Sequence, residues 1–192
     1  ADVSAAGFAP QGQELLLASR GRSSLCQVRG VVGGCCGSED VQRSDWPLMH
    51  SAPTSLAVTG TPGRQGVRGL AVRSGQLVVL EESSPGVWEV AGLLPAPARR
   101  WVSVALQPGL AIALDDTGAI FEMDTDSGQW AAPWQMDSRR LSWTSLCADP
   151  SASSPWLLLG HSRDAGAAEL WRFNRHLEQP IPTRKDAKAA EQ

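Results

Sequence analysis

The sequence predicts an all-β fold, an array of about four short antiparallel β-sheet units. Its 19 glycines and 13 prolines recur between short apolar runs, which is typical of chains with many strands and tight turns. The same order of strand, turn and strand returns several times along the chain. No segment shows the apolar periodicity of a long amphipathic helix. With 192 residues, the chain is long enough for one domain with a substantial core.

The clearest unit spans residues 101–123 and predicts three strands joined by two turns. Pro108 and Gly109 end its first strand, because proline lacks an N–H donor and glycine tolerates positive φ. Residues 110–114 are nearly all apolar, as expected of a strand that is buried on both faces. Residues 115–118, with the sequence Asp-Asp-Thr-Gly, predict the hairpin turn into the return strand.

Similar units are predicted at residues 5–28, 67–90 and 143–173, and residues 54–59 predict a further strand. In the later units, the matched turn positions recur at a spacing of about 40 residues, close to the period of a propeller blade. These turn positions are Pro10, Ser74, Pro108 and Pro150.

The repeated units resemble the blades of WD40-like and quinoprotein-like β-propellers over roughly residues 3–173. The Trp-Asp dipeptide that ends a WD40 blade is absent, and Gly160-His161 is a single Gly-His pair. The resemblance implies a propeller-like array of four sheets, the smallest number that closes a ring. Three arrangements stay open at this point: a four-bladed ring, a partial propeller completed by another chain, and a sandwich or barrel.

We expect one β-propeller-like domain over residues 1–175, with an insertion at about 31–66. A glycine-rich segment opens the insertion, where the strand pattern weakens. Residues 176–192 lose the apolar periodicity and predict an extended or disordered, non-β tail.

Charge and hydropathy exclude some classes of function. The net charge of −3 argues against a nucleic-acid partner, and no apolar run is long enough for a transmembrane span. Peripheral attachment to a membrane complex stays open. The first residues, Ala-Asp-Val, resemble the start of a processed chain, so we favour an organellar or exported protein over a cytoplasmic one.

The four cysteines allow one bridge across the insertion. Cys26 could pair with Cys35 or Cys36 in an oxidising compartment. Cys147 lies within an apolar run, and we expect it to be a small core residue.

Acidic turns give the first candidates for metal chemistry, and a cluster of Cys35, Cys36 and His50 is a second, weaker one. Asp124 and Asp126 have the spacing that begins a calcium loop, but the bidentate Glu of an EF-hand loop is missing. Asp116 and Asp126 each begin an aspartic-protease-like Asp-x-Gly motif, yet two motifs on one hairpin cannot supply a two-fold carboxylate pair. Both motifs are ordinary turn chemistry. We therefore predict no catalytic residues and no cofactor.

The eight tryptophans are the most unusual feature of the composition. Most are expected to pack between sheets. Trp46, Trp130 and Trp134 are the candidates for an interface, because Trp130 and Trp134 flank Pro133 and could form an exposed aromatic platform.

A repeated sheet without a catalytic set favours a non-enzymatic scaffold or accessory subunit of a larger, possibly organellar, multiprotein complex. Its partners would be other protein subunits. One alternative is a module that binds glycans or small ligands through exposed Trp. Another is a hydrolase on a propeller, with Asp115, Asp116 and Asp124 projecting into a central funnel.

Overall fold

The computed structural model describes residues 3–8, 14–19, 24–29, 41–45, 53–59, 69–84, 87–95, 100–136, 141–148, 155–162, 168–174 and 181–182. Every regular element within these ranges is a β-strand, which confirms the all-β class. The described residues include no helix with the length and apolar character needed to cross a membrane.

The strands form four antiparallel sheets of four strands each, and each sheet follows chain order. The first contains β1 (Val3–Phe8), β2 (Glu14–Ser19), β3 (Ser24–Arg29) and β4 (Val41–Asp45). The second contains β5 (Ser55–Val58), β6 (Gly69–Arg73), β7 (Gln76–Ser84) and β8 (Val87–Leu93). The third contains β9 (Trp101–Gln107), β10 (Leu110–Asp115), β11 (Ala119–Asp124) and β12 (Trp134–Gln135). The fourth contains β13 (Leu141–Ala148), β14 (Pro155–Ser162), β15 (Ala168–Asn174) and β16 (Ile181–Pro182).

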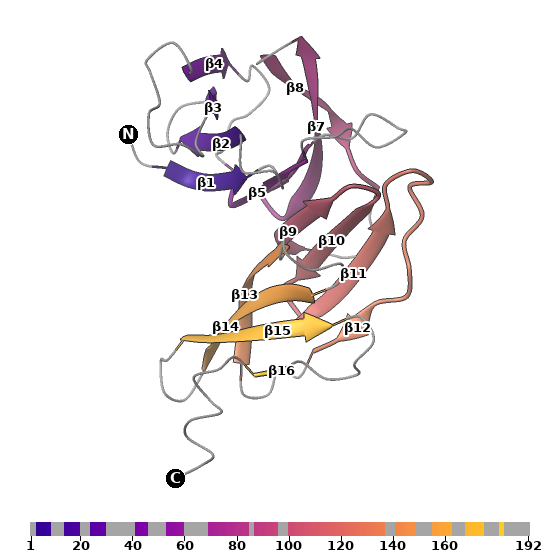
Figure 1. Cartoon of the computed structure of the whole chain (residues 1–192). Helices are drawn as coiled ribbons and strands as arrows, with labels where there is room; N and C mark the ends of the chain where they lie inside the picture. The colour runs from indigo at the N-terminus through magenta and orange to yellow at the C-terminus, as the bar shows by residue number, and fades with distance from the viewer. Residues whose placement is uncertain are drawn as a thin grey trace.

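The sheets stack through the first strand of each one. Strand β1 lies against β5, β5 against β9, and β9 against β13, so these four are the inner strands of a propeller-like array. The first and fourth sheets lie at opposite ends of the array (Figure 1). The described strands therefore form an open array, not a closed ring of four sheets.

The turn between β10 and β11 is the predicted hairpin turn, and Asp115 organises it. Its Oδ1 accepts hydrogen bonds from the backbone N–H of Thr117 (2.9 Å), the Thr117 hydroxyl (2.7 Å) and the backbone N–H of Ala119 (2.8 Å). Gly118 has a φ of 85°, the left-handed conformation that glycine adopts without strain. Asp115 is only 7% exposed, so its carboxylate provides a hydrogen-bond acceptor to backbone N–H groups that have little access to water.

A second tight turn ties the second sheet to the third. Ser74 and Gly75 both have positive φ, 49° and 78°, as in a two-residue hairpin turn. The Trp101 N–H, at the start of β9, donates to the Gly75 carbonyl at 2.8 Å. This bond aligns the start of the third inner strand with the turn of the preceding sheet.

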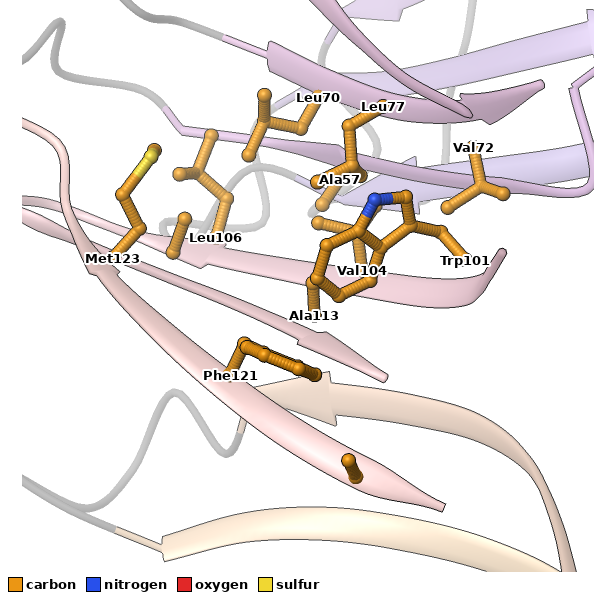
Figure 2. Close-up of a cluster of buried hydrophobic side chains, with 12 residues drawn as sticks. Ala57, Leu70, Val72, Leu77, Trp101, Val104, Leu106, Ala113, Phe121 and Met123 are labelled. Atoms are coloured by element: carbon orange, nitrogen blue, oxygen red, sulfur yellow. The ribbon is translucent and has the colours of Figure 1, made fainter. Parts of the chain in front are cut away.

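Apolar side chains fill the space between successive sheets. Figure 2 shows the cluster between the second and third sheets, in which Trp101 lies among Ala57, Val72 and Val104. Trp101 also meets Phe121 edge-on, with ring centroids 5.1 Å apart. Two further clusters separate the first sheet from the second and the third from the fourth. The predicted apolar strand β10 contributes to two of these layers, since Ala111 and Ala113 face one side and Ile112 and Leu114 the other.

One core prediction is wrong. Cys147 is exposed, although it lies within an apolar strand. Its neighbour Leu146 is buried against the third sheet, and successive side chains of a strand point to opposite faces. Cys147 therefore faces away from the rest of the array.

Parts of the predicted insertion and tail form strands. Strands β4 and β5 lie within residues 31–66, and β5 coincides with the strand predicted at 54–59. The two-residue strand β16 lies within residues 176–192 and pairs with β15. The other residues of these two segments are outside the described part of the chain, apart from 53, 54 and 59, and the domain boundaries stay a prediction.

Candidate functional site

Trp130 packs its ring into the third sheet and leaves an edge at the rim of the array. The ring stacks on Trp101, with centroids 5.4 Å apart and planes 18° apart, and meets Phe121 edge-on. Its Nε1–H donates to the Pro95 carbonyl at 3.0 Å. This bond joins the outer part of the third sheet to the segment that leaves β8. Trp130 is therefore a half-buried side chain held by three partners, not a free platform.

Trp134 is also half-buried. It begins β12, where Ile120 of β11 is its register partner, and it packs against the core between the third and fourth sheets. Between the two tryptophans, Ala131, Ala132 and Pro133 are exposed. The structure therefore brings Trp130 and Trp134 to the two ends of one exposed apolar segment.

The neighbouring sheet extends this apolar surface. Leu94, directly after β8, is half-buried and packs against the same apolar cluster as Trp130. Pro95 follows it, is exposed, and accepts the Trp130 hydrogen bond. The exposed Leu93 lies on the opposite face of the second sheet, because its register partner Val78 belongs to the cluster against the first sheet. We define the rim patch by its half-buried or exposed apolar residues on these two neighbouring segments: Leu94, Pro95, Trp130, Ala131, Ala132, Pro133 and Trp134.

The metal candidates form a turn. Asp124 Oδ1 accepts the backbone N–H of Asp126 at 2.8 Å and of Ser127 at 3.0 Å. The Ser127 and Asp126 hydrogen bonds lower the pKa of the Asp124 carboxyl below its ordinary value. Across the described residues, no group of three or more His, Cys, Asp or Glu side chains could hold a metal ion. The Asp124 carboxylate therefore stabilises the turn after β11 by accepting two of its backbone N–H groups.

The three aspartates that a hydrolase on this fold would use do not lie together at one site. Asp115 and Asp116 follow the last pairs of the β10–β11 hairpin, whereas Asp124 pairs with Leu110 at its other end. Five strand residues separate the two ends, which amounts to roughly 17 Å. Carboxylates that act together on one bond lie within about 10 Å of each other. Asp115 and Asp124 each accept hydrogen bonds within a turn, and the two turns lie at opposite ends of the β10–β11 hairpin.

Trp46, Cys35 and Cys36 lie outside the described residues, and of Cys26 only the backbone in β3 is described. The interface role of Trp46 and the disulfide across the predicted insertion therefore stay predictions.

Sequence reasoning missed the serines of the inner strands. Ser55 Oγ accepts the backbone N–H of Val104 at 3.1 Å, and Ser103 Oγ accepts that of Leu146 at 3.1 Å. Each bond crosses from one inner strand to the next. A signal was present in the sequence, because a serine followed two residues later by a small residue recurs at 55, 103 and 145.

No protein-family model matches the sequence, and no curated protein matches it significantly. Solved structures do resemble the fold. A chain of Kuenenia stuttgartiensis hydrazine synthase matches with a TM-score of 0.61 at 11% identity, covering 94% of this chain and 54% of its own. The β-propeller domain of Myceliophteria thermophila Cps50 (Swd1) matches with a TM-score of 0.59 at 11% identity, covering 90% and 52%.

These matches support the β-propeller resemblance at the level of architecture. At 11% identity they establish the fold and no activity. The chain spans about half the length of the solved structures it matches.

Proposed function

We propose that this protein is a non-enzymatic scaffold or accessory subunit of a larger multiprotein complex, acting through protein–protein contacts. The observation that carries the proposal is the rim patch. It places two half-buried tryptophans, a half-buried leucine and two exposed prolines on adjoining segments of the second and third sheets.

The composition of the rim patch fits a protein partner. Tryptophan is enriched among interface hot spots, and partly buried anchors lose little conformational entropy on binding. Trp130 is already fixed by Trp101 and by the Pro95 carbonyl, so its position is set before a partner arrives. The same stacking covers ring surface that a sugar would need, which favours a protein partner over the glycan alternative.

The test compares complexes isolated from the native source. The account predicts that the endogenous protein migrates in an assembly larger than two copies of itself. An Ala132→Glu variant should retain its fold, because Ala132 is exposed, yet co-purify with at least tenfold less of its partner subunits.

The matched control is Gln76→Glu, which adds the same charge at an exposed residue of β7 outside the rim patch. It should leave the complex intact. An endogenous protein that never exceeds the mass of two copies would contradict the accessory-subunit role. Equal loss in both variants would show that the rim patch is not the contact surface.

A further inference from the structure

The peptide group between Arg100 and Trp101 is held from two sides, at one end of the second and third sheets. Its carbonyl, that of Arg100, accepts the backbone N–H of Asp116 at 3.1 Å, in the turn between β10 and β11. Its N–H, that of Trp101, donates to the carbonyl of Gly75 at 2.8 Å, in the turn between β6 and β7. The backbone at Arg100 therefore has a fixed position between two hairpin turns.

Gly75 also places the side-chain stem of Arg100. A Cβ added at Gly75 would lie 2.7 Å from the Cγ of Arg100 and 3.6 Å from its Cβ and its Cδ. The stem of the arginine therefore lies across the bare Cα of this glycine. An arginine whose stem is already ordered loses less conformational entropy when its guanidinium binds a ligand.

The guanidinium of Arg100 is accessible to a partner. Arg100 is exposed, and within the part of the chain that the structure describes it forms no ion pair, although the exposed Asp116 lies in the adjoining turn. A guanidinium presents its N–H donors in one plane, which matches the two oxygens of a carboxylate. Arg100 is thus a preorganised contact for an anionic group.

Charge is divided between the two ends of the second and third sheets. Arg73 and Arg100, the two arginines whose side chains are described, both lie at the end where β6 and β7 are joined, and we call this end, with the Ser74–Gly75 turn, the arginine end. In the sequence, arginine pairs precede both β9 and β13, at 99–100 and 139–140. Exposed carboxylates lie toward the opposite end of the same two sheets: Glu81, Glu89, Asp124 and Asp126.

We propose that the arginine end binds an acidic segment of a partner protein, with a carboxylate of that segment paired to the Arg100 guanidinium. Charge complementarity carries the choice of partner. A short acidic segment fits better than a nucleic acid, because a long polyanion would be repelled by the acidic opposite end and by the net charge of −3. This contact shares no residue with the rim patch and does not depend on the accessory-subunit role.

The first test is the binding of a fluorescein-labelled octaglutamate peptide to the purified chain, followed by fluorescence anisotropy at low ionic strength. Saturable binding is expected, and it should weaken as salt is added, because exposed ion pairs are screened. In an NMR titration with the same peptide, the amide signals of Gly75, Trp101 and Asp116 should shift. A folded protein that does not bind the peptide would overturn the proposal. Tighter binding of an oligothymidylate of equal charge would also overturn it, in favour of a phosphate polyanion.

Variants separate a specific contact from a general effect of charge. Arg100→Gln should raise the dissociation constant of the peptide roughly 3- to 10-fold. Arg100→Lys, which keeps the charge without the planar donors, should raise it less. Both variants should fold, because Arg100 is exposed. Gln129→Glu is the matched control, since it makes the same change in net charge at an exposed turn residue of the opposite end, and it should bind like the parent. Equal losses in Gln129→Glu and Arg100→Gln would overturn the role of Arg100.

The accessory-subunit role fails or survives separately. Ala132→Glu alters the rim patch and should lose partner subunits while it still binds the octaglutamate peptide like the parent.

Discussion

At the scale of single residues, carboxylates in this protein hold turns. Asp115 and Asp124 each accept backbone N–H groups from the residues that follow them, and each marks one end of the β10–β11 hairpin. The two differ in exposure, since Asp115 is buried and Asp124 is exposed. Removal of each should therefore have a different consequence.

Asp115→Ala should lower the free energy of unfolding by about 1–3 kcal/mol, because the buried Ala119 N–H loses its hydrogen-bond acceptor. Urea denaturation measures the change. Asp116→Ala is the adjacent control, since Asp116 is exposed, and it should stay within about 0.5 kcal/mol of the parent. Equal effects in the two variants would contradict the role of Asp115 in the turn.

The pKa of Asp124 is lowered from 3.8, chiefly by the Ser127 N–H and then by the Asp126 N–H. Because the folded pKa lies below the unfolded one, the ionised carboxylate stabilises the fold above the unfolded pKa, and this stabilisation is lost as the pH falls through the folded pKa. Asp124→Asn should therefore flatten the dependence of stability on pH below about pH 4. An NMR titration of the side chain that gives a midpoint above 3.8 would refute this.

At the scale of elements, the strands and hairpin turns followed from local chemistry. Glycine, proline and Asp-x-x-Gly segments ended strands as expected, and residues 110–114 gave β10, which faces apolar layers on both sides. Contacts between sheets could not be predicted in the same way, because residues far apart in the chain decide them. Cys147 shows the difference: its neighbours in sequence are apolar, but it lies on the exposed face of β13, opposite the buried Leu146, and no local pattern indicates which face is buried.

The rim patch was partly predictable. The spacing of Trp130 and Trp134 around Pro133 indicated an aromatic surface, but the stacking of Trp130 on Trp101 depends on how the chain returns after Asp124. Leu94 and Pro95 reach this surface from the end of the second sheet, and no local sequence pattern predicts their contact with Trp130.

The serine bonds between sheets should contribute measurably to stability. Ser103→Ala leaves the buried Leu146 N–H without its acceptor, and we expect a loss of about 1–3 kcal/mol in urea denaturation, with faster hydrogen exchange at the Leu146 amide. Ser83→Ala is the control, because its hydroxyl bonds Glu89 on the exposed surface of the second sheet. A Ser103→Ala protein as stable as the Ser83→Ala protein would contradict a structural role for the inner serines.

At the scale of the whole molecule, the account rests on an open array of four sheets. Each sheet presents a small inner face toward the next, and the first and fourth sheets lie apart (Figure 1). A closed four-bladed ring would instead bury the first and fourth sheets against each other.

Chemical cross-linking between the two end faces tests this claim most directly. An Ala6→Cys chain, treated with a short bismaleimide, carries one thiol on the outer face of β1 and the native Cys147 thiol on the outer face of β13. Peptide mass spectrometry would locate the link, and a denaturing gel would give the mass of the product. The account predicts no link within one chain, because the first and fourth sheets lie at opposite ends of the array. A link between the two thiols of a single chain would show that the four sheets close on themselves, and it would contradict the open array.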